Sequence, residues 1–430
     1  MLREPITRTA FAAALRAGHG RALQQILLHG AAGLEDLIIG ACLFCQVHDP
    51  QAEAKRTPWL FSIIETAQMH SEIFEAIKAE GLAPSHEDLF DLNQRSGILK
   101  LLATAGMDDA RKLLYASLAR AADTADVIAA DDIVALDGVN GLIHVARQLG
   151  RWLRADTDFW VDDTLYSRCF ASPGAEQGLA LLERAATSDA DVSRYLAEVC
   201  TSRDGLAGRN TDFSLSAFTA DDILTHLRNK PRDPCHWFRG WGAQASSDQR
   251  EAIFMALMSV EQPEHAKKLF KCFAKTGVPR FERRLLRWID QPDKPLRLAA
   301  VTAFAAISHP QLRVTAERLI ADGDFANGVA LLVNNSAEGD FATFVQYLPR
   351  LEDNEELHRV VRQLLRFCDA NPVNESLDCL LYVYECSPCS TCRKRAVKAM
   401  IDTKLAPSWL LVEAAFDADP DTRALVVPVR

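Results

Sequence analysis

Three cysteines at two-residue spacing, Cys386, Cys389 and Cys392, come nearest in this chain to a recognised chemical motif. Clustered thiolates bind soft metal ions, and a close pair of thiols can form a redox-sensitive disulfide. Zinc usually takes four ligands, and an iron–sulfur run would need a further cysteine four positions after the third, where Ala396 stands. We therefore expect structural thiols at the start of a helix and no metal cofactor, with a metal ion or a redox pair as the alternatives.

The residues around these cysteines place them in a turn between two helices. Pro388 excludes a helix that runs through the stretch, and Ser390 or Thr391 is a suitable N-cap for the helix that follows. In such a turn the sulfurs of Cys389 and Cys392 can face one another, and the N-terminus of a helix stabilises a thiolate. The spacing thus predicts proximity of two thiols, whatever their chemistry.

Two other cysteine groups suggest a metal or a nucleophile. Cys42, Cys45 and His48 have the spacing C-x-x-C-x-x-H, but the apolar run around them predicts a buried helix face, with a metal as the alternative. Cys235 precedes His236, yet neighbours in sequence seldom have the geometry of a nucleophile and its base. Since no motif of a phosphate loop, a dinucleotide fold or a serine hydrolase occurs either, we predict no catalytic residues, which favours a protein that is not an enzyme and leaves an enzyme as the alternative.

Aromatic and cationic residues suggest surfaces that bind a partner. Trp237, Arg239 and Trp241 occur in the stretch DPCHWFRGWG, and tryptophan and arginine are the usual anchors of protein interfaces. The alternative is that the tryptophans fold back into a junction between helices. Residues 264–297 are rich in lysine and arginine. Within this stretch we expect Arg280, Arg284 and Arg287 to share one helix face. That face would be a docking patch for an acidic partner or phosphate, or an ordinary solvated surface.

Composition narrows the class of protein. The 430 residues carry a net charge of −10, which argues against general affinity for nucleic acid. The longest apolar run is far below the roughly 20 residues needed to cross a bilayer, so no membrane segment is predicted. The 11 cysteines form an odd, scattered set without an export signal, which predicts reduced thiols in the cytoplasm.

Hydrophobic periodicity predicts helices almost throughout. Two stripes at i, i+3, i+4, i+7 spacing are the clearest, and no series of alternating strands competes with them. Helix starts are marked by a capping residue before proline, at Asp49-Pro50, His309-Pro310 and Asp419-Pro420. We predict an all-α protein of roughly twenty helices. The stripes comprise Leu296, Ala299, Ala300, Ala303, Phe304 and Ile307, and Leu357, Val360, Val361, Leu364, Leu365 and Cys368.

The C-terminal part resembles HEAT-type helical repeats over residues 292–430. The resemblance rests on DKPLRLAAVTAFAAISHPQLRVTAERLIA at 293–321, on ADPDTRALV near the C-terminus, and on a proline followed three residues later by arginine, as in Pro310 to Arg313. It implies a right-handed α-solenoid of antiparallel helix pairs, as in HEAT and armadillo proteins, with a long concave surface. The period drifts, so the array would be degenerate.

A concentration of glycine, serine, asparagine and proline divides the chain. We expect an N-terminal helical domain at 1–200, an irregular junction or inserted loop at 201–248, and a HEAT-like repeat domain at 249–430. The boundary rests on composition alone.

The predicted architecture suggests a non-enzymatic scaffold that binds a protein partner on its concave surface. One alternative is a HEAT-like DNA glycosylase or another nucleic-acid enzyme, which would need the basic residues of 264–297 and Trp237 or Trp241 in one groove with a carboxylate such as Asp290. A second is a thiol- or metal-dependent sensor, and a third is an acidic immunity-type or decoy protein that blocks a basic partner. The sequence leaves the partner and the oligomeric state open.

Overall fold

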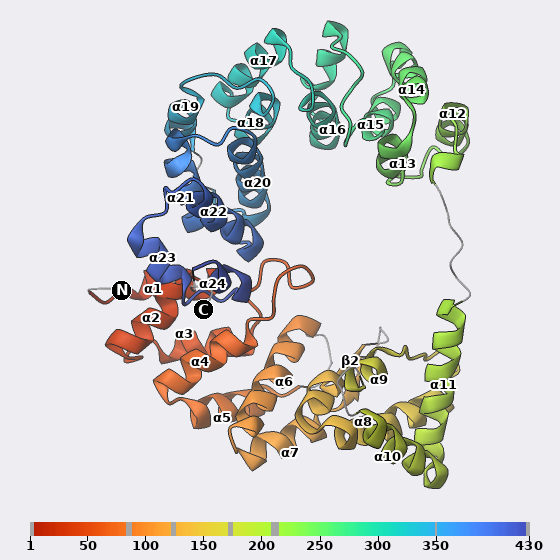
Figure 1. The fold of residues 1–430 in the computed structure, drawn as a ribbon, viewed down its shortest axis with the longest axis vertical. Coiled ribbons are helices and arrows are strands. Elements are labelled where there is room, and N and C mark those ends of the chain that lie inside the picture. The colour runs from red at the N-terminus through yellow and green to blue at the C-terminus, as the bar shows by residue number, and fades with distance from the viewer. Residues whose placement is uncertain are drawn as a thin grey trace. The chain divides into compact units, whose positions relative to one another are not determined.

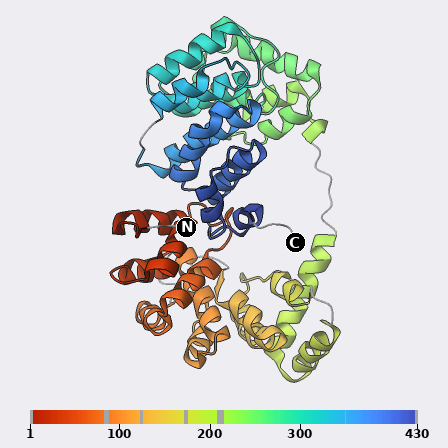
Figure 2. The same ribbon diagram turned by 60° about the vertical axis from the view of Figure 1, so that its left-hand side comes forward.

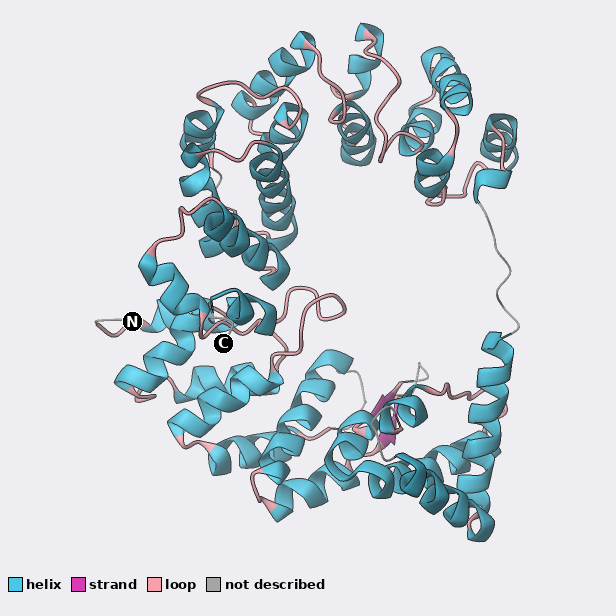
Figure 3. Ribbon diagram, viewed as in Figure 1, coloured by secondary structure: helices cyan, strands magenta, loops and turns pink. Residues whose placement is uncertain are grey.

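The computed structural model describes residues 4–82, 88–121, 126–170, 175–207, 215–348 and 351–426. These residues are mostly helical, with 24 α-helices and three short 3-10 segments (Figures 1 and 3). The strands among them, β1 (Ala119–Arg120) and β2 (Val127–Ile128), form one antiparallel pair. The all-α fold class is thereby confirmed. None of the described helices combines the length and the apolar character needed to cross a membrane.

The chain forms two compact units, which we call unit 1 and unit 2. Unit 1 comprises Met1–Thr211 together with Ser408–Arg430, and unit 2 comprises Asp212–Pro407. Residues 408–426, which the sequence analysis assigned to the C-terminal domain, therefore pack with the N-terminal helices (Figure 2). Of the expected junction at 201–248, residues 208–214 lie outside the described part of the chain, and helices resume beyond it.

The elements of unit 1 pack against their neighbours along the chain and against the next but one, and α8 also packs closely against α11. Besides the strand pair they are α1 (Arg8–Ala17), α2 (Gly20–His29), α3 (Glu35–Leu43), α4 (Thr57–Ala67), α5 (His70–Glu80), α6 (Leu89–Thr104), α7 (Asp108–Ala116), α8 (Ala130–Ala155), α9 (Thr164–Cys169), α10 (Ala175–Ser188), α11 (Ala190–Ala207), α23 (Ser408–Ala414) and α24 (Pro420–Val426).

In unit 2, too, several helices contact the next but one, as α16 contacts α18, α18 contacts α20, and α20 contacts α22. The elements are η1 (Leu215–Ala217), α12 (Ala220–Asn229), α13 (Phe238–Gln244), α14 (Ser247–Ser259), α15 (Pro263–Lys271), η2 (Arg283–Trp288), α16 (Lys294–Phe304), α17 (Pro310–Ala321), α18 (Phe325–Leu332), α19 (Asp340–Tyr347), α20 (Asn354–Ala370), η3 (Asn374–Ser376), α21 (Leu377–Cys386) and α22 (Ser390–Asp402).

Local sequence signals account for most helix starts in unit 2. The stripe on α20 is confirmed, because all six of its residues are buried. His309 caps α17 by accepting a hydrogen bond from the Gln311 N–H, and Pro310 opens that helix. The same signal at Asp49-Pro50 was misleading, because a turn follows it and α4 begins only at Thr57.

Two arginines of the proline–arginine pattern join helices in unit 2: Arg313, three residues after Pro310, and Arg297, which follows Pro295 in a form shortened to two residues. Arg313 on α17 donates two hydrogen bonds, of 3.1 and 2.7 Å, to the carboxylate of Asp340, the first residue of α19. Arg297 on α16 donates at 2.8 Å to Asp324, the N-cap of α18. Each carboxylate lies at the N-terminus of a helix, where the helix dipole also favours negative charge. The two pairs therefore link α16 to α18 and α17 to α19.

A buried carboxylate joins the two ends of the chain within unit 1. Glu413 on α23 is 7% exposed, accepts a 2.8 Å hydrogen bond from Arg21 Nε, and lies 3.5 Å from His19 Nδ1. The Trp59 indole donates to the Phe416 carbonyl at 2.8 Å, and the Ala418 N–H donates to the Gly18 carbonyl at 2.9 Å. Paired buried charges of this kind are costly to break, because one partner then stays buried and unpaired.

Gly20 allows α2 to approach the backbone at Glu413. A Cβ at this position would lie 2.0 Å from the Glu413 carbonyl oxygen, which is closer than side-chain atoms pack. At Gly40, inside α3, an added Cβ would meet no atom within 4 Å. A methyl group added at Gly20 would therefore clash with the backbone at Glu413, whereas one added at Gly40 would not clash.

Gly20→Ala is expected to lower the free energy of unfolding by about 1–3 kcal/mol, because the backbone at Glu413 must shift. Gly40→Ala is the matched control and should raise it by about 0.5–1 kcal/mol, the usual gain from removing glycine inside a helix. Urea unfolding followed by circular dichroism measures both. Equal stability of the two variants would show that α2 and α23 do not pack as described.

The same contact predicts a loss of stability in acid. Burial raises the pKa of the Glu413 carboxyl, but the hydrogen bond to His19 and the charge of Arg21 outweigh burial and hold its pKa below the ordinary value of 4.5. A lowered pKa in the folded state contributes stability above pH 4.5 that is lost as the pH falls further, because the unfolded chain then binds the proton more readily.

We expect Glu413→Gln to be less stable than the unmodified protein at neutral pH, and the difference to shrink as the pH falls below 4.5. Denaturant unfolding over a pH series gives the two curves. Glu65→Gln, at an exposed position of α4, should run parallel to the unmodified protein. A Glu413→Gln difference that does not vary with pH would contradict the assignment.

Candidate functional site

The tryptophans expected to bind a partner have separate places in unit 2. Trp241 is fully buried, and its indole donates a 2.8 Å hydrogen bond to the Phe218 carbonyl, so it belongs to the core and not to a surface. Trp237 is half-buried, with its ring edge-on to those of His226 and Phe238. Arg239 is exposed. The surface expected here therefore reduces to Arg239 and one edge of Trp237.

The three expected arginines do not share a helix face, because Arg280 precedes η2 and the segment around Arg284 and Arg287 is a 3-10 helix. They are brought into one row by α14 instead. Arg280 lies over the Phe254 ring, 4.6 Å from its centroid; Arg284 Nε is 3.4 Å from the Met258 sulfur; Arg287 donates at 2.7 Å to the Val260 carbonyl. Packing against α14 has replaced the helical periodicity that the sequence suggested.

Carboxylates compensate much of this positive charge. Arg280 forms ion pairs with Glu251 and Glu282, and Arg287 with Glu261. Asp290, the carboxylate needed by the nucleic-acid alternative, pairs with Arg318 on α17. Because Trp241 is in the core, it does not line a groove with Asp290 and the basic residues described here.

The predicted turn of cysteines is present, with different helix boundaries. Cys386 ends α21 and is exposed, whereas Cys389 and Cys392 are buried. Helix α22 begins at Ser390 with Cys389 as its N-cap, so the expected cap at Ser390 or Thr391 is wrong. The Ser387 hydroxyl accepts the Cys389 N–H at 3.2 Å and donates to its carbonyl at 3.0 Å, which closes the turn.

A histidine that the sequence analysis did not identify completes the cluster. One donor atom each of His358, Cys389 and Cys392 lies within 4.8 Å of the other two. The hydrogen bond from Cys392 and, to a smaller extent, the one from His358 lower the pKa of the Cys389 thiol. The same bond to Cys389 raises the pKa of the Cys392 thiol. His358 lies on α20, far from the cysteines in sequence, and no spacing rule signals it.

The other cysteine groups behave as core residues or satisfied polar groups. Burial raises the pKa of Cys42 to about 12, and Cys45 lies beyond the end of α3, so only Cys42 occupies the expected helix face. The histidine beside Cys235 is His226, not His236. His226 Nε2 is 2.8 Å from the carboxylate of Asp233, whose carbonyl accepts the Cys235 thiol at 3.3 Å.

The largest cavity described lies in unit 2 between α19 and the segment from η3 into α21. Its volume is about 960 Å³, within the range of binding sites for small molecules and peptides. Phe341 and Phe367 form its floor, and the exposed Val345 and Val373 lie at its edge. The lining residues are Ser336, Ala337, Glu338, Gly339, Phe341, Ala342, Val345, Gln346, Phe367, Asn371, Val373, Glu375 and Asp378. We call this cavity the α19–α21 groove.

The groove is acidic. Glu338, Glu375 and Asp378 are exposed, and the described residues that line the groove include no lysine, arginine or histidine. Apolar surface bordered by charge of one sign is typical of a recognition site. Sequence reasoning missed it because its residues belong to separate elements and no motif connects them.

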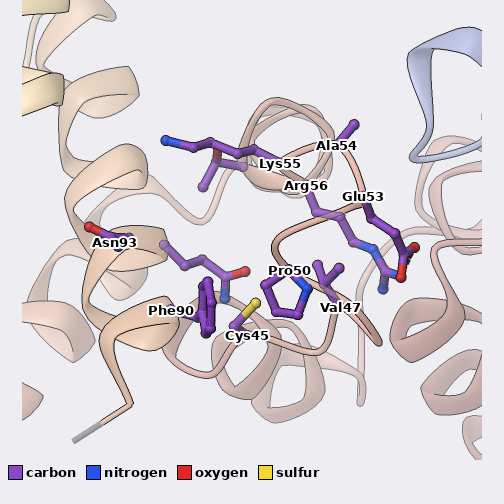
Figure 4. A pocket seen from close by; sticks show the side chains of 11 residues that line it. Cys45, Val47, Pro50, Glu53, Ala54, Lys55, Arg56, Phe90 and Asn93 are labelled. Atoms are coloured by element: carbon purple, nitrogen blue, oxygen red, sulfur yellow. Dashed lines mark ion pairs between the residues drawn. The ribbon is translucent and has the colours of Figure 1, made fainter. Parts of the chain in front are cut away.

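Unit 1 has a much smaller pocket, shown in Figure 4. Its volume is about 130 Å³, and Cys45, Pro50 and Phe90 lie around it. The side chains of Glu53 and Arg56 point toward one another at its edge, 3.8 Å apart. A pocket of this size holds at most a ligand about the size of benzene, so the α19–α21 groove is the stronger candidate.

The burial of the cysteines predicts an order of stabilities. Cys386→Ser should change the free energy of unfolding by less than about 0.5 kcal/mol, since exposed positions tolerate substitution. Cys392→Ser should lower it by about 1–3 kcal/mol, because a hydroxyl replaces a thiol that is 3% exposed. Urea unfolding compares them, and an equal effect of both would contradict the described burial.

No protein-family model matches this chain, and no curated protein or solved structure is significantly similar to it.

Proposed function

We propose that this protein is a non-enzymatic helical-repeat scaffold, and that the α19–α21 groove binds a basic, partly apolar segment of a partner protein. The observation that carries the proposal is the groove, where apolar residues meet three carboxylates and none of the described lining residues is cationic. The concave surface expected from the resemblance to HEAT repeats stays a prediction. The free state of all eleven cysteines supports a reducing, cytoplasmic setting.

We further propose that unit 2 is a right-handed α-solenoid of antiparallel helix pairs. Two observations support it. Alternate helices contact one another along α16, α18, α20 and α22. The Arg297–Asp324 and Arg313–Asp340 pairs repeat the same kind of link from one helix to the N-terminus of the next but one. Repetition of one contact from pair to pair is the physical basis of a solenoid.

The chemistry of the groove defines the partner segment. Phe341, Val345 and Val373 offer apolar contacts for leucine or phenylalanine side chains. Glu338 and Glu375 at its edge would attract lysine or arginine next to them and repel an acidic segment. Helix-bounded grooves often take peptides in this way, with apolar anchors and flanking charges.

Two synthetic peptides with the same leucine positions test the proposal, one with lysine at the remaining positions and one with glutamate. Fluorescence anisotropy should show saturable binding of the lysine peptide, weaker binding at high salt, and none of the glutamate peptide. Glu375→Lys should weaken the lysine peptide about tenfold, because attraction becomes repulsion. Val345→Asp should weaken it through loss of apolar contact.

Glu65→Lys is the matched control, since it makes the same charge change at an exposed site in unit 1. It should leave the dissociation constant within about twofold, as expected for a distant charge screened by salt. If Glu65→Lys and Glu375→Lys have equal effects, the peptide binds through net charge and the groove is not the site. Equal binding of both peptides would also reject the proposal.

A further inference from the structure

The cluster of His358, Cys389 and Cys392 has the composition and the geometry of a metal site. The cysteines come from the first turn of α22 and its N-cap, and the histidine from α20, which packs against α22. Their donor atoms lie within 4.8 Å of one another. In a tetrahedral zinc site such atoms are about 3.5–3.8 Å apart, given bonds of about 2.3 Å to sulfur and 2.0–2.1 Å to nitrogen. Side-chain movements of about 1 Å would therefore close the site.

We infer that His358, Cys389 and Cys392 bind one zinc(II) ion, with a water molecule in the fourth position. Two sulfurs and one imidazole form a soft donor set that selects zinc over magnesium or calcium. Two cysteines and one histidine, with water in the fourth position, are a known coordination of zinc. Binding displaces the remaining thiol protons to solvent and requires no oxidant.

The histidine distinguishes this site from a simple dithiol. A disulfide would join only Cys389 and Cys392, whereas His358, on a different helix, also lies within reach of both sulfurs. A metal uses all three groups and links α20 to α22. Cys386, the third cysteine of the sequence motif, is exposed and lies outside the cluster, so it is not a ligand.

Charge around the cluster does not oppose the ion. Arg362 and Arg395 are close enough to act on the Cys392 thiol. Those arginines would repel a bare dication, but zinc with two thiolates and a neutral imidazole carries no net charge. A second group of side chains with suitable donor atoms comprises His226, Asp233 and Cys235.

In that second group the donors are already used within the loop. The carboxylate of Asp233 bonds the His226 ring and the Cys235 N–H, and the Cys235 thiol donates to the Asp233 carbonyl. The ammonium groups of Lys268 and Lys271 donate to carbonyls of the same loop. The first cluster offers two sulfurs and this group only one, so the first has the softer donor set, and the inference is confined to it.

Cobalt(II) and zinc(II) titrations of the full-length, metal-stripped protein test the inference. We expect cobalt to give a sulfur-to-metal charge-transfer band that saturates at one equivalent and disappears on addition of zinc. Cys389→Ser, Cys392→Ser and His358→Gln should each weaken zinc binding by at least about tenfold, measured against a chromophoric chelator. Cys386→Ser should bind zinc as the unmodified protein does.

Thermal unfolding provides a readout that does not depend on the cysteine variants folding well. Zinc should raise the unfolding temperature of the unmodified protein and of Cys386→Ser, but not that of His358→Gln, whose position is only half-buried. Loss of binding in Cys386→Ser, undiminished binding in His358→Gln, or no saturable cobalt band would each overturn the site. Peptide binding in the α19–α21 groove uses other residues, so failure of one proposal leaves the other unaffected.

Discussion

The structure depends on the need of short helices to bury their apolar stripes against one another. Most helices here span two to four turns, a length at which an isolated helix is marginal in water. The 17-residue α20 shows how the problem is solved, because its six stripe residues are all buried. Burial of this kind is not directional, so the polar contacts between helices must set their relative positions.

In unit 2 those polar contacts lie at helix N-termini. Arg313 reaches Asp340 across a gap between helices, and Arg297 reaches Asp324 in the same manner. Burial raises the pKa of the Asp324 carboxyl, but the hydrogen bonds from Arg297 and Asn327 and the charge of Arg359 outweigh burial. The pKa is therefore lowered overall, and the group stays ionised. In unit 1 the buried carboxylate of Glu413 links two segments from opposite ends of the chain, through its ion pair with Arg21.

The groove and the thiol cluster use different parts of α20. Phe367 and Asn371 near its C-terminal end line the groove, whereas His358 near its N-terminal end faces the two cysteines. Phe367 follows His358 by nine positions, which corresponds to about 14 Å along the helix. The two proposed sites are thus distinct, but one rigid helix carries residues of both. A metal that fixes α20 against α22 would act on the same helix that forms the floor of the groove.

The sequence by itself determined the helical class, the buried stripe of α20 and the start of α17 at His309-Pro310, because all three depend on residues a few positions apart. It also indicated that Cys389 and Cys392 would be close, since they are three residues apart at a helix start. Only the tertiary structure decided that His358 joins them, that Trp241 is in the core, and that Arg280 packs along α14. It also decided that residues 408–426 return to α2. These outcomes depend on which helices pack together, and contacts between residues distant in sequence leave no periodic signal in the chain.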